Sequence, residues 1–115
     1  MIYMAVPIKE IDLVYGKLIL VRHGQSIYNE ENRFTGWKDV DLTQKGVNEA
    51  VSSASLLSNQ SIDLAFTSNL KRAQKTLDLI LNKLNLNIII TKDIALNERD
   101  YGSLVGQNKM EAAEK

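Results

Sequence analysis

Three groups of polar residues in this 115-residue sequence have the types needed to bind an anion and transfer a phosphoryl group. A histidine can attack phosphorus through a neutral ring nitrogen, and arginines grip phosphate oxygens in a fixed fork geometry. A nearby carboxyl group can move a proton to or from the reacting oxygen. The first group is Arg22, His23 and Gly24, the second is Thr67, Ser68 and Arg72, and the third is Glu98, Arg99, Tyr101 and Gly102.

Short apolar runs alternate with amphipathic stretches along the chain, which predicts an α/β fold with a mostly parallel sheet flanked by helices. The apolar runs predict strands over residues 17–21, 62–67 and 87–91, the first of them covered on both faces. Apolar residues at helical spacing predict helices from Thr43, as the N-cap, to about residue 58 and from Ser68, as the N-cap, to about residue 85.

Each polar group follows the carboxyl end of one predicted strand. Ligands of open α/β sheets bind beyond those ends, so we expect the three groups to meet at one edge of the sheet. Every residue taken alone also has an ordinary explanation. Arg72 lies off the apolar stripe of its helix, as a solvated surface arginine would, and a loop ion pair of Glu98 with Arg99 would contribute little. A lone histidine at a strand end is commonly just a hydrogen-bonded residue.

The two ends of the chain carry weaker signals. Residues 1–16 lack the basic leader and cleavage site of a secretory signal, so we expect a disordered or loosely packed extension. A short added strand over residues 11–15 is the alternative, and residues 17–115 form the predicted domain. Asn108 and Glu111 resemble a capping box at the start of a helix that the sequence does not complete. We therefore expect a partial domain, incomplete at its C-terminus.

The composition excludes several classes of protein. Hydrophobic residues make up 44% and charged residues 24%, with 14 basic and 14 acidic side chains, so there is no electrostatic footprint for nucleic acid or an anionic membrane. The sequence has no cysteine and a single histidine, which excludes disulfide frameworks, thiolate zinc sites and histidine-rich metal sites. No apolar run approaches the roughly 20 residues that cross a bilayer. We expect a cytoplasmic protein.

Longer motifs around the polar groups resemble the phosphoglycerate mutases of the histidine phosphatase superfamily. Arg22-His23-Gly24 is similar to the tripeptide that carries the nucleophilic histidine there, and Phe34-Thr35-Gly36-Trp37 narrows the resemblance to the mutases that depend on 2,3-bisphosphoglycerate. Residues 67–73 and 96–102 match two further blocks in order, and residues 106–109 match a fourth. The resemblance covers about residues 17–115.

The resemblance implies interconversion of 3-phosphoglycerate and 2-phosphoglycerate through a phosphohistidine, in glycolysis and gluconeogenesis. It implies 2,3-bisphosphoglycerate as the priming phosphoryl donor and no metal. His23 would be phosphorylated, Arg22 and Arg72 would hold the transferring group, and Glu98 would donate and accept the proton. The other residues of the substrate pocket would be Ser26, Asn29, Thr35, Gly36, Arg99, Tyr101 and Lys109. The expected partners are a small phosphorylated substrate and either a second copy of the chain or a complementing C-terminal fragment, without nucleic acid or membrane.

The sequence departs from that family in length. Family members are about twice as long, and their later half supplies a second catalytic histidine, whereas His23 is the only histidine here. A strand that lies between the first two strands in the family is also missing, which would leave apolar edges unpaired. We therefore expect little or no mutase activity from the chain alone. A related phosphatase and a non-catalytic gene fragment remain as alternatives.

Overall fold

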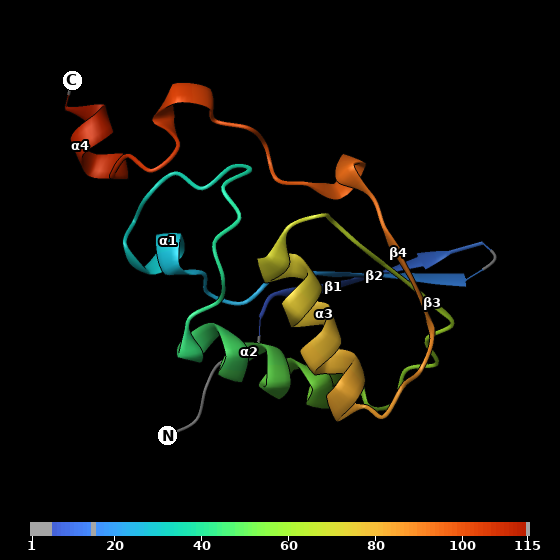
Figure 1. Cartoon of the computed structure of the whole chain (residues 1–115). Helices are drawn as coiled ribbons and strands as arrows, with labels where there is room; N and C mark the ends of the chain where they lie inside the picture. The colour runs from blue at the N-terminus through green and yellow to red at the C-terminus, as the bar shows by residue number, and fades with distance from the viewer. Residues whose placement is uncertain (1–5, 15, 115) are drawn as a thin grey trace.

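The computed structural model of the chain describes residues 6–14 and 16–114 (Figure 1). The sequence-based prediction of an α/β fold is confirmed, since strands and helices alternate along most of the chain. In order they are β1 (Ile8–Leu13), β2 (Gly16–Val21), α1 (Ile27–Glu30), α2 (Gln44–Ala54), η1 (Ser55–Leu57), β3 (Leu64–Thr67), α3 (Lys71–Lys83), β4 (Ile89–Lys92), η2 (Ile94–Leu96), η3 (Gly102–Leu104) and α4 (Lys109–Ala113), where η denotes a short 3-10 helix.

The strands form two separate pairs. β1 and β2 are antiparallel, with Ile8 opposite Val21, and β3 and β4 are parallel, with Leu64 opposite Ile89. The predicted parallel pairing is therefore present between β3 and β4. Within the described part of the chain, no hydrogen-bonded ladder joins β2 to β3, so the expected single sheet is divided in two.

β1 corrects the prediction of a disordered or loosely packed extension. Residues 8–13 pair with β2 along their whole length, and the Val6 N–H donates to Ser53 Oγ at 2.8 Å in a buried position. Ile8 packs against the core together with Ile19 of β2, and burial of this apolar surface stabilises the hairpin. The alternative of a strand in this segment was right, but the strand covers residues 8–13 and not the predicted residues 11–15. Residues 1–5 and 15 lie outside the described residues.

α2 and α3 pack against each other and enclose the core. Thr43 caps α2 as predicted, since its Oγ1 accepts a hydrogen bond from Gly46 N at 3.1 Å. Ser68 was wrongly predicted as the cap of α3. Its hydroxyl instead accepts from Leu70 N at 3.2 Å, and the helix begins only after that turn. The core cluster consists of Ala54, Leu57 and Ile80, with Ile8, Ile19, Ile62 and Leu84 packed against it.

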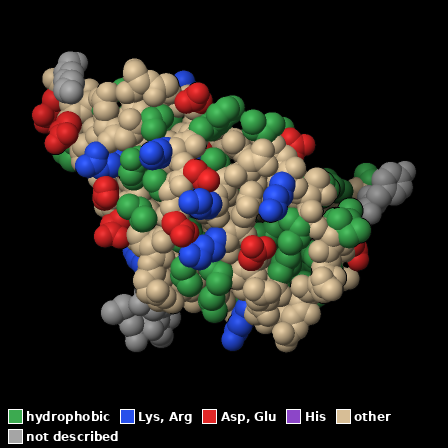
Figure 2. All heavy atoms as spheres, in the orientation of Figure 1, with side chains coloured by type: hydrophobic (Ala, Val, Ile, Leu, Met, Phe, Trp, Pro, Cys, Tyr) green, Lys and Arg blue, Asp and Glu red, His purple; other side chains and the backbone are tan. Residues whose placement is uncertain are grey.

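One face of the strands is apolar and open to solvent. The exposed fraction is 47% for Leu20 in β2, 61% for Phe66 in β3 and 71% for Ile89 in β4. Figure 2 shows hydrophobic side chains gathered on the surface in the region of β3 and β4. The prediction that β2 is covered on both faces is therefore wrong for this structure. The expectation of unpaired strand edges agrees with the two separate sheets, in which β2 and β3 each pair with a single strand within the described residues.

α4 lies beside α1 at the end of the molecule away from the core (Figure 1). Asn108 caps it as predicted, because its Oδ1 accepts from Met110 N at 2.9 Å. The Lys109 N–H donates to Asn32 O at 2.8 Å, which fixes the start of the helix against the segment after α1. Among the described helices, none has the length and apolar character needed to cross a membrane.

Candidate active site

His23 follows the carboxyl end of β2, and its ring has a defined orientation. Nδ1 lies 2.6 Å from the carbonyl oxygen of Gly24. Because a carbonyl oxygen only accepts hydrogen bonds, Nδ1 carries the proton and Nε2 keeps its lone pair. Burial is the main cause that lowers the pKa of His23 below its ordinary value of 6.5, and the positive charges of Arg72 and Arg22 lower it as well. The hydrogen bond to Gly24 and the negative charge of Glu98 raise this pKa, but the net shift is downward. The neutral, nucleophilic imidazole is therefore favoured at neutral pH.

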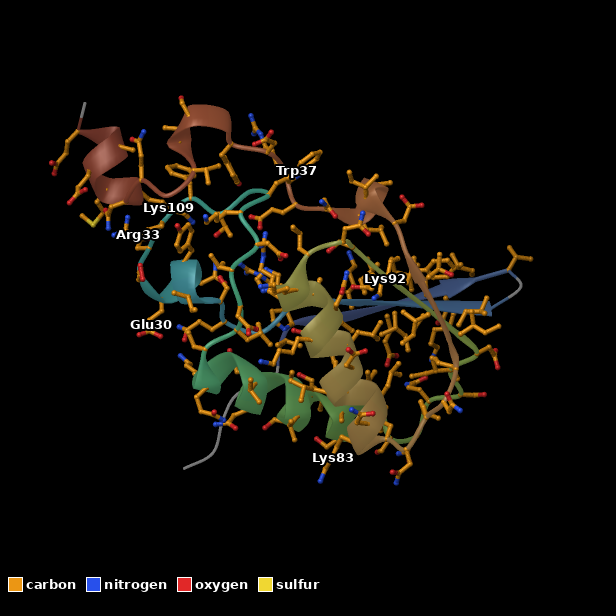
Figure 3. All side chains as sticks on the ribbon, in the orientation of Figure 1. Glu30, Arg33, Trp37, Lys83, Lys92 and Lys109 are labelled. Carbon is orange, nitrogen blue, oxygen red and sulfur yellow. The ribbon has the colours of Figure 1, made fainter. Side chains whose placement is uncertain are left out.

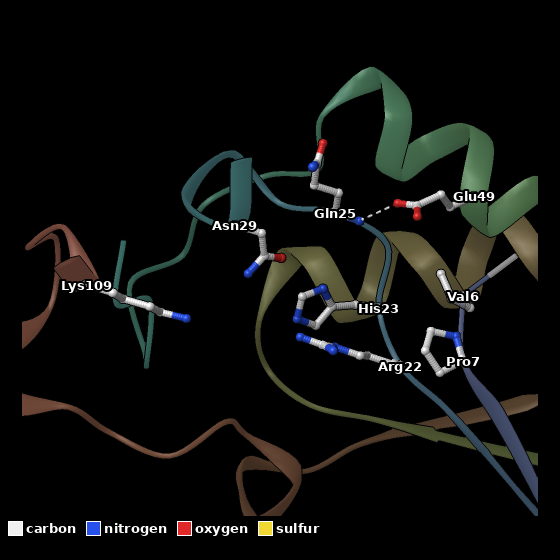
Figure 4. Close-up of a pocket in the computed structure, with 8 residues that line it drawn as sticks. All are labelled: Val6, Pro7, Arg22, His23, Gln25, Asn29, Glu49 and Lys109. Atoms are coloured by element: carbon white, nitrogen blue, oxygen red, sulfur yellow. Dashed lines mark hydrogen bonds between the residues drawn. The ribbon is translucent and has the colours of Figure 1, made fainter. Parts of the chain in front are cut away.

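His23 borders a cavity of about 320 Å³ (Figure 4). The sequence-predicted residues that line it with His23 are Arg22, Asn29 and Lys109. In Figure 4 the Arg22 guanidinium lies beside the His23 ring, and Lys109 enters from the end opposite Val6 and Pro7. Two cationic side chains and an uncharged nucleophile beside one cavity are suited to an anionic phosphate ester. The remaining lining residues are Val6, Pro7, Gln25 and Glu49.

Arg72 is a buried arginine in the first turn of α3, with 1% of its surface exposed. Nη1 donates to Lys38 O at 2.9 Å, and Nη2 donates to Gly36 O at 2.6 Å and to Glu98 Oε2 at 2.7 Å. The ordinary explanation of a solvated surface arginine is therefore wrong. The guanidinium instead joins α3 to the loop before α2 and to the loop after β4.

Gly36 lets the chain turn where it contributes a carbonyl to Arg72. Its φ of +53° lies in the left-handed region, and a Cβ there would be 3.1 Å from both Arg99 O and Tyr101 N. Next to it, the Trp37 Nε1–H donates to the backbone oxygen of Glu98 at 2.7 Å, and Figure 3 shows this indole on the loop that faces the segment after β4. Glu98 is thus held by Arg72 at its carboxylate and by Trp37 at its backbone.

Seven of the sequence-predicted site residues do not line the cavity, namely Ser26, Thr35, Gly36, Arg72, Glu98, Arg99 and Tyr101. Ser26 is fully buried and caps α1, because its Oγ accepts from Asn29 N at 3.2 Å. Thr35 is buried beside Gly36. Tyr101 packs on Phe34 with ring centroids 5.1 Å apart, and Arg99 lies over the Tyr101 ring. A direct role of these seven residues in substrate binding stays a prediction.

The residues that hold the turn after His23 were not predicted from the sequence. The Gly24 N–H donates to Thr76 Oγ1 at 3.1 Å, and the Gln25 N–H donates to Glu49 Oε1 at 3.0 Å. Gly46 lies so close to this turn that a Cβ on it would overlap the Gln25 backbone. A glycine within a helix is unfavourable, so Gly46 is the feature of the sequence that indicates this close backbone packing.

One or two members of each predicted polar group lie near one another, although the strands that precede them belong to two separate sheets and not to one. Arg22 and His23 follow β2, Arg72 follows β3, and Glu98 follows β4. Arg72 and Glu98 are in direct contact, and the pKa of His23 responds to the charges of Arg22, Arg72 and Glu98. In the described part of the chain, no group of three or more His, Asp or Glu side chains is arranged to hold a metal ion.

Comparison with known proteins identifies the family. The family model described as histidine phosphatase superfamily (branch 1) matches residues 18–115. The chain belongs to this superfamily. The matched region begins within β2, so β1 lies outside it.

Two curated relatives of the chain are named 2,3-bisphosphoglycerate-dependent phosphoglycerate mutase. The protein from Elusimicrobium minutum is 53% identical over 86% of this chain and 41% of its own length. The protein from Nitrobacter hamburgensis is 56% identical over 85% of this chain and 49% of its own length. The solved structure of Bacillus stearothermophilus YhfR has a TM-score of 0.75 and 30% identity, over 81% of this chain and 45% of that one. The chain thus spans less than half the length of these proteins.

Proposed function

We propose that this chain forms a phosphohistidine at His23 and serves the interconversion of 3-phosphoglycerate and 2-phosphoglycerate. The observation that carries the proposal is the bond from His23 Nδ1 to Gly24 O, which leaves the Nε2 lone pair available beside Arg22 and Lys109. The names of the relatives supply the substrate class. The reaction would belong to glycolysis and gluconeogenesis and would take place in the cytoplasm.

The donor set around the cavity fits a small bisphosphorylated donor. Arg22 and Lys109 lie on different sides of His23 (Figure 4), so they can bind two separate anionic groups. When bound, 2,3-bisphosphoglycerate supplies the phosphoryl group that primes His23. No metal is needed for charge neutralisation, because the arginines and the lysine provide it.

The residues of the chain divide the transfer step between them. His23 Nε2 attacks phosphorus, a new N–P bond forms, and the bond from phosphorus to the ester oxygen breaks. Glu98 in its protonated form provides the proton that the departing oxygen takes with its electron pair, and the resulting carboxylate takes up a proton again when a substrate hydroxyl later accepts the phosphoryl group from Nε2. Arg22 at the cavity stabilises the charge on the equatorial oxygens, and the buried Arg72 adds positive charge at longer range and holds Glu98 in place. Asn29 contributes an amide group at the same cavity.

The test is incubation of the purified chain with 2,3-bisphosphoglycerate labelled in its phosphoryl groups. We expect acid-labile label on His23 and none in a His23→Gln variant. Because the relatives are about twice as long, we expect turnover of 3-phosphoglycerate far below that of a full-length relative. Label on another residue would overturn the proposal. The absence of any label would favour the alternative of a non-catalytic fragment.

Hydrolysis of the phosphohistidine is the second candidate. The Glu98 side chain is 39% exposed, so water can approach the carboxylate that would activate it. Measuring free phosphate against 2-phosphoglycerate after labelling separates the two functions. A mutase gives mainly 2-phosphoglycerate, and a phosphatase gives mainly free phosphate.

A further inference from the structure

Thr76 connects the turn after His23 to the helix that carries Arg72. The Gly24 N–H donates to Thr76 Oγ1 at 3.1 Å, and the Thr76 hydroxyl donates to Arg72 O at 2.7 Å. Thr76 is buried, and so are both hydrogen bonds. One hydroxyl therefore links the two segments that contribute the nucleophile and the buried guanidinium.

The direction of these two bonds is fixed by the chemistry of the hydroxyl group. A hydroxyl has one proton and two lone pairs. The proton is used by the carbonyl of Arg72, four residues earlier on α3, which is a common bond for threonine in helices. The lone pairs are left to accept from the Gly24 N–H. A side chain without a hydroxyl would leave that N–H buried without its partner.

Gly24 in turn determines which nitrogen of His23 is the nucleophile. Its carbonyl oxygen accepts from Nδ1 at 2.6 Å and so directs the lone pair to Nε2. The same glycine lies against the backbone of Gly46, which leaves no room for a Cβ. A shift of this turn would weaken the bond to Nδ1, distribute the proton over both ring nitrogens and displace Nε2 relative to Arg72.

We propose that Thr76 is a positioning residue for His23, which fixes the Gly24 turn and with it the tautomer of the nucleophile. The inference rests on the proposed function, because its catalytic consequence is the rate at which Nε2 is phosphorylated. Thr76 itself does not line the cavity, since the cavity is bordered by other residues. Its effect passes through Gly24.

The experiment compares Thr76→Val, which keeps the shape of the side chain, with Thr76→Ser, which keeps the hydroxyl. Ile80→Val, one turn further along α3 in the core cluster, is the control for lost stability alone. Two properties are measured: the phosphorylation rate of His23 with potassium phosphoramidate, and the ring ¹⁵N chemical shifts of unphosphorylated His23. We expect Thr76→Val to slow phosphorylation about tenfold or more and to shift the ring nitrogens toward mixed tautomers. Thr76→Ser should retain both properties.

Ile80→Val should lower the unfolding temperature without changing either property. Phosphorylation of folded Thr76→Val at the unsubstituted rate would overturn the inference. If Thr76→Val does not fold, Thr76→Ala decides in the same way, because alanine is well tolerated within helices. If the unsubstituted chain takes no phosphoryl group, the proposed function fails, and the ¹⁵N shifts alone decide. Unchanged shifts in the variant without the hydroxyl would reject a positioning role for Thr76, and a changed tautomer would support it.

Discussion

Arg72 Nη2 lies 2.7 Å from Glu98 Oε2, and the two side chains differ sharply in exposure, at 1% and 39%. The buried guanidinium also binds the carbonyls of Gly36 and Lys38. Arg72 is therefore part of the internal structure, whereas the partly exposed Glu98 carboxylate can reach a ligand or solvent. This asymmetry separates the roles of the two residues and makes them separable by mutation.

Arg72→Lys should lower both stability and activity. Lysine keeps the charge but lacks the planar fork that binds three acceptors at once. The lost charged hydrogen bonds should lower the free energy of unfolding by about 2–4 kcal/mol, measured by urea denaturation.

Glu98→Gln is the matched variant on the other side of the pair. It should change stability by less than about 1 kcal/mol, because the carboxylate is partly exposed, yet it should slow proton transfer. Equal destabilisation by the two variants would contradict the assignment.

Gly46→Ala should destabilise the protein although alanine is the better helix former. The added Cβ would overlap the Gln25 backbone, so the turn after His23 has to move. We expect a loss of about 2 kcal/mol or more in the free energy of unfolding, together with slower labelling of His23. Gly16→Ala is the control, because nothing lies within 4 Å of a Cβ at that position. A neutral result for Gly46→Ala would show that the contact relaxes freely.

Phosphorylation of His23 should depend on pH with a midpoint below 6.5. The pKa is lowered chiefly by burial, so the unfolded chain binds more protons than the folded chain between the two pKa values. The stability linked to this group is therefore full above pH 6.5 and is lost as the pH falls toward the folded pKa. The nucleophilic neutral form declines over the same range. Because the sequence contains a single histidine, one NMR titration measures the pKa directly.

Glu98→Gln tests the direction in which the Glu98 charge shifts the pKa of His23. The Glu98 charge raises the pKa of His23, whereas the charges of Arg72 and Arg22 lower it. Removing the carboxylate charge should therefore lower the pKa of His23 further. A pKa above 6.5 in the unsubstituted chain, or a rise in the variant, would disprove the electrostatic account of the site.

Trp37→Phe should loosen the loop that carries Glu98. The substitution removes the donor that binds Glu98 O at 2.7 Å and keeps most of the apolar ring. We expect a loss of about 1 kcal/mol in the free energy of unfolding and slower transfer through Glu98, with labelling by phosphoramidate unchanged. Chemical denaturation followed by circular dichroism measures the first effect, since the variant lacks the only tryptophan. A labelling rate reduced as much as the transfer rate would argue against this role.

Features determined by short segments were predictable from the sequence. Thr43 and Asn108 cap helices because their side chains bond to amides two or three residues ahead. β1 was misplaced because its stability depends on the packing of Ile8 against the core rather than on a strand-like pattern. The burial of Arg72 could not be foreseen, since its acceptors Gly36 and Lys38 lie in an irregular loop far away in sequence.

β1 also has a consequence for how the molecule behaves among its neighbours. An uncovered strand border is a template on which other polypeptides can assemble. In this protein one border of β2 is occupied by β1, which carries Lys9, Glu10 and Asp12. Ionised side chains on an outermost strand disfavour the docking of further strands. The charges of β1 should therefore reduce fibril-like association at the β1 edge of the hairpin.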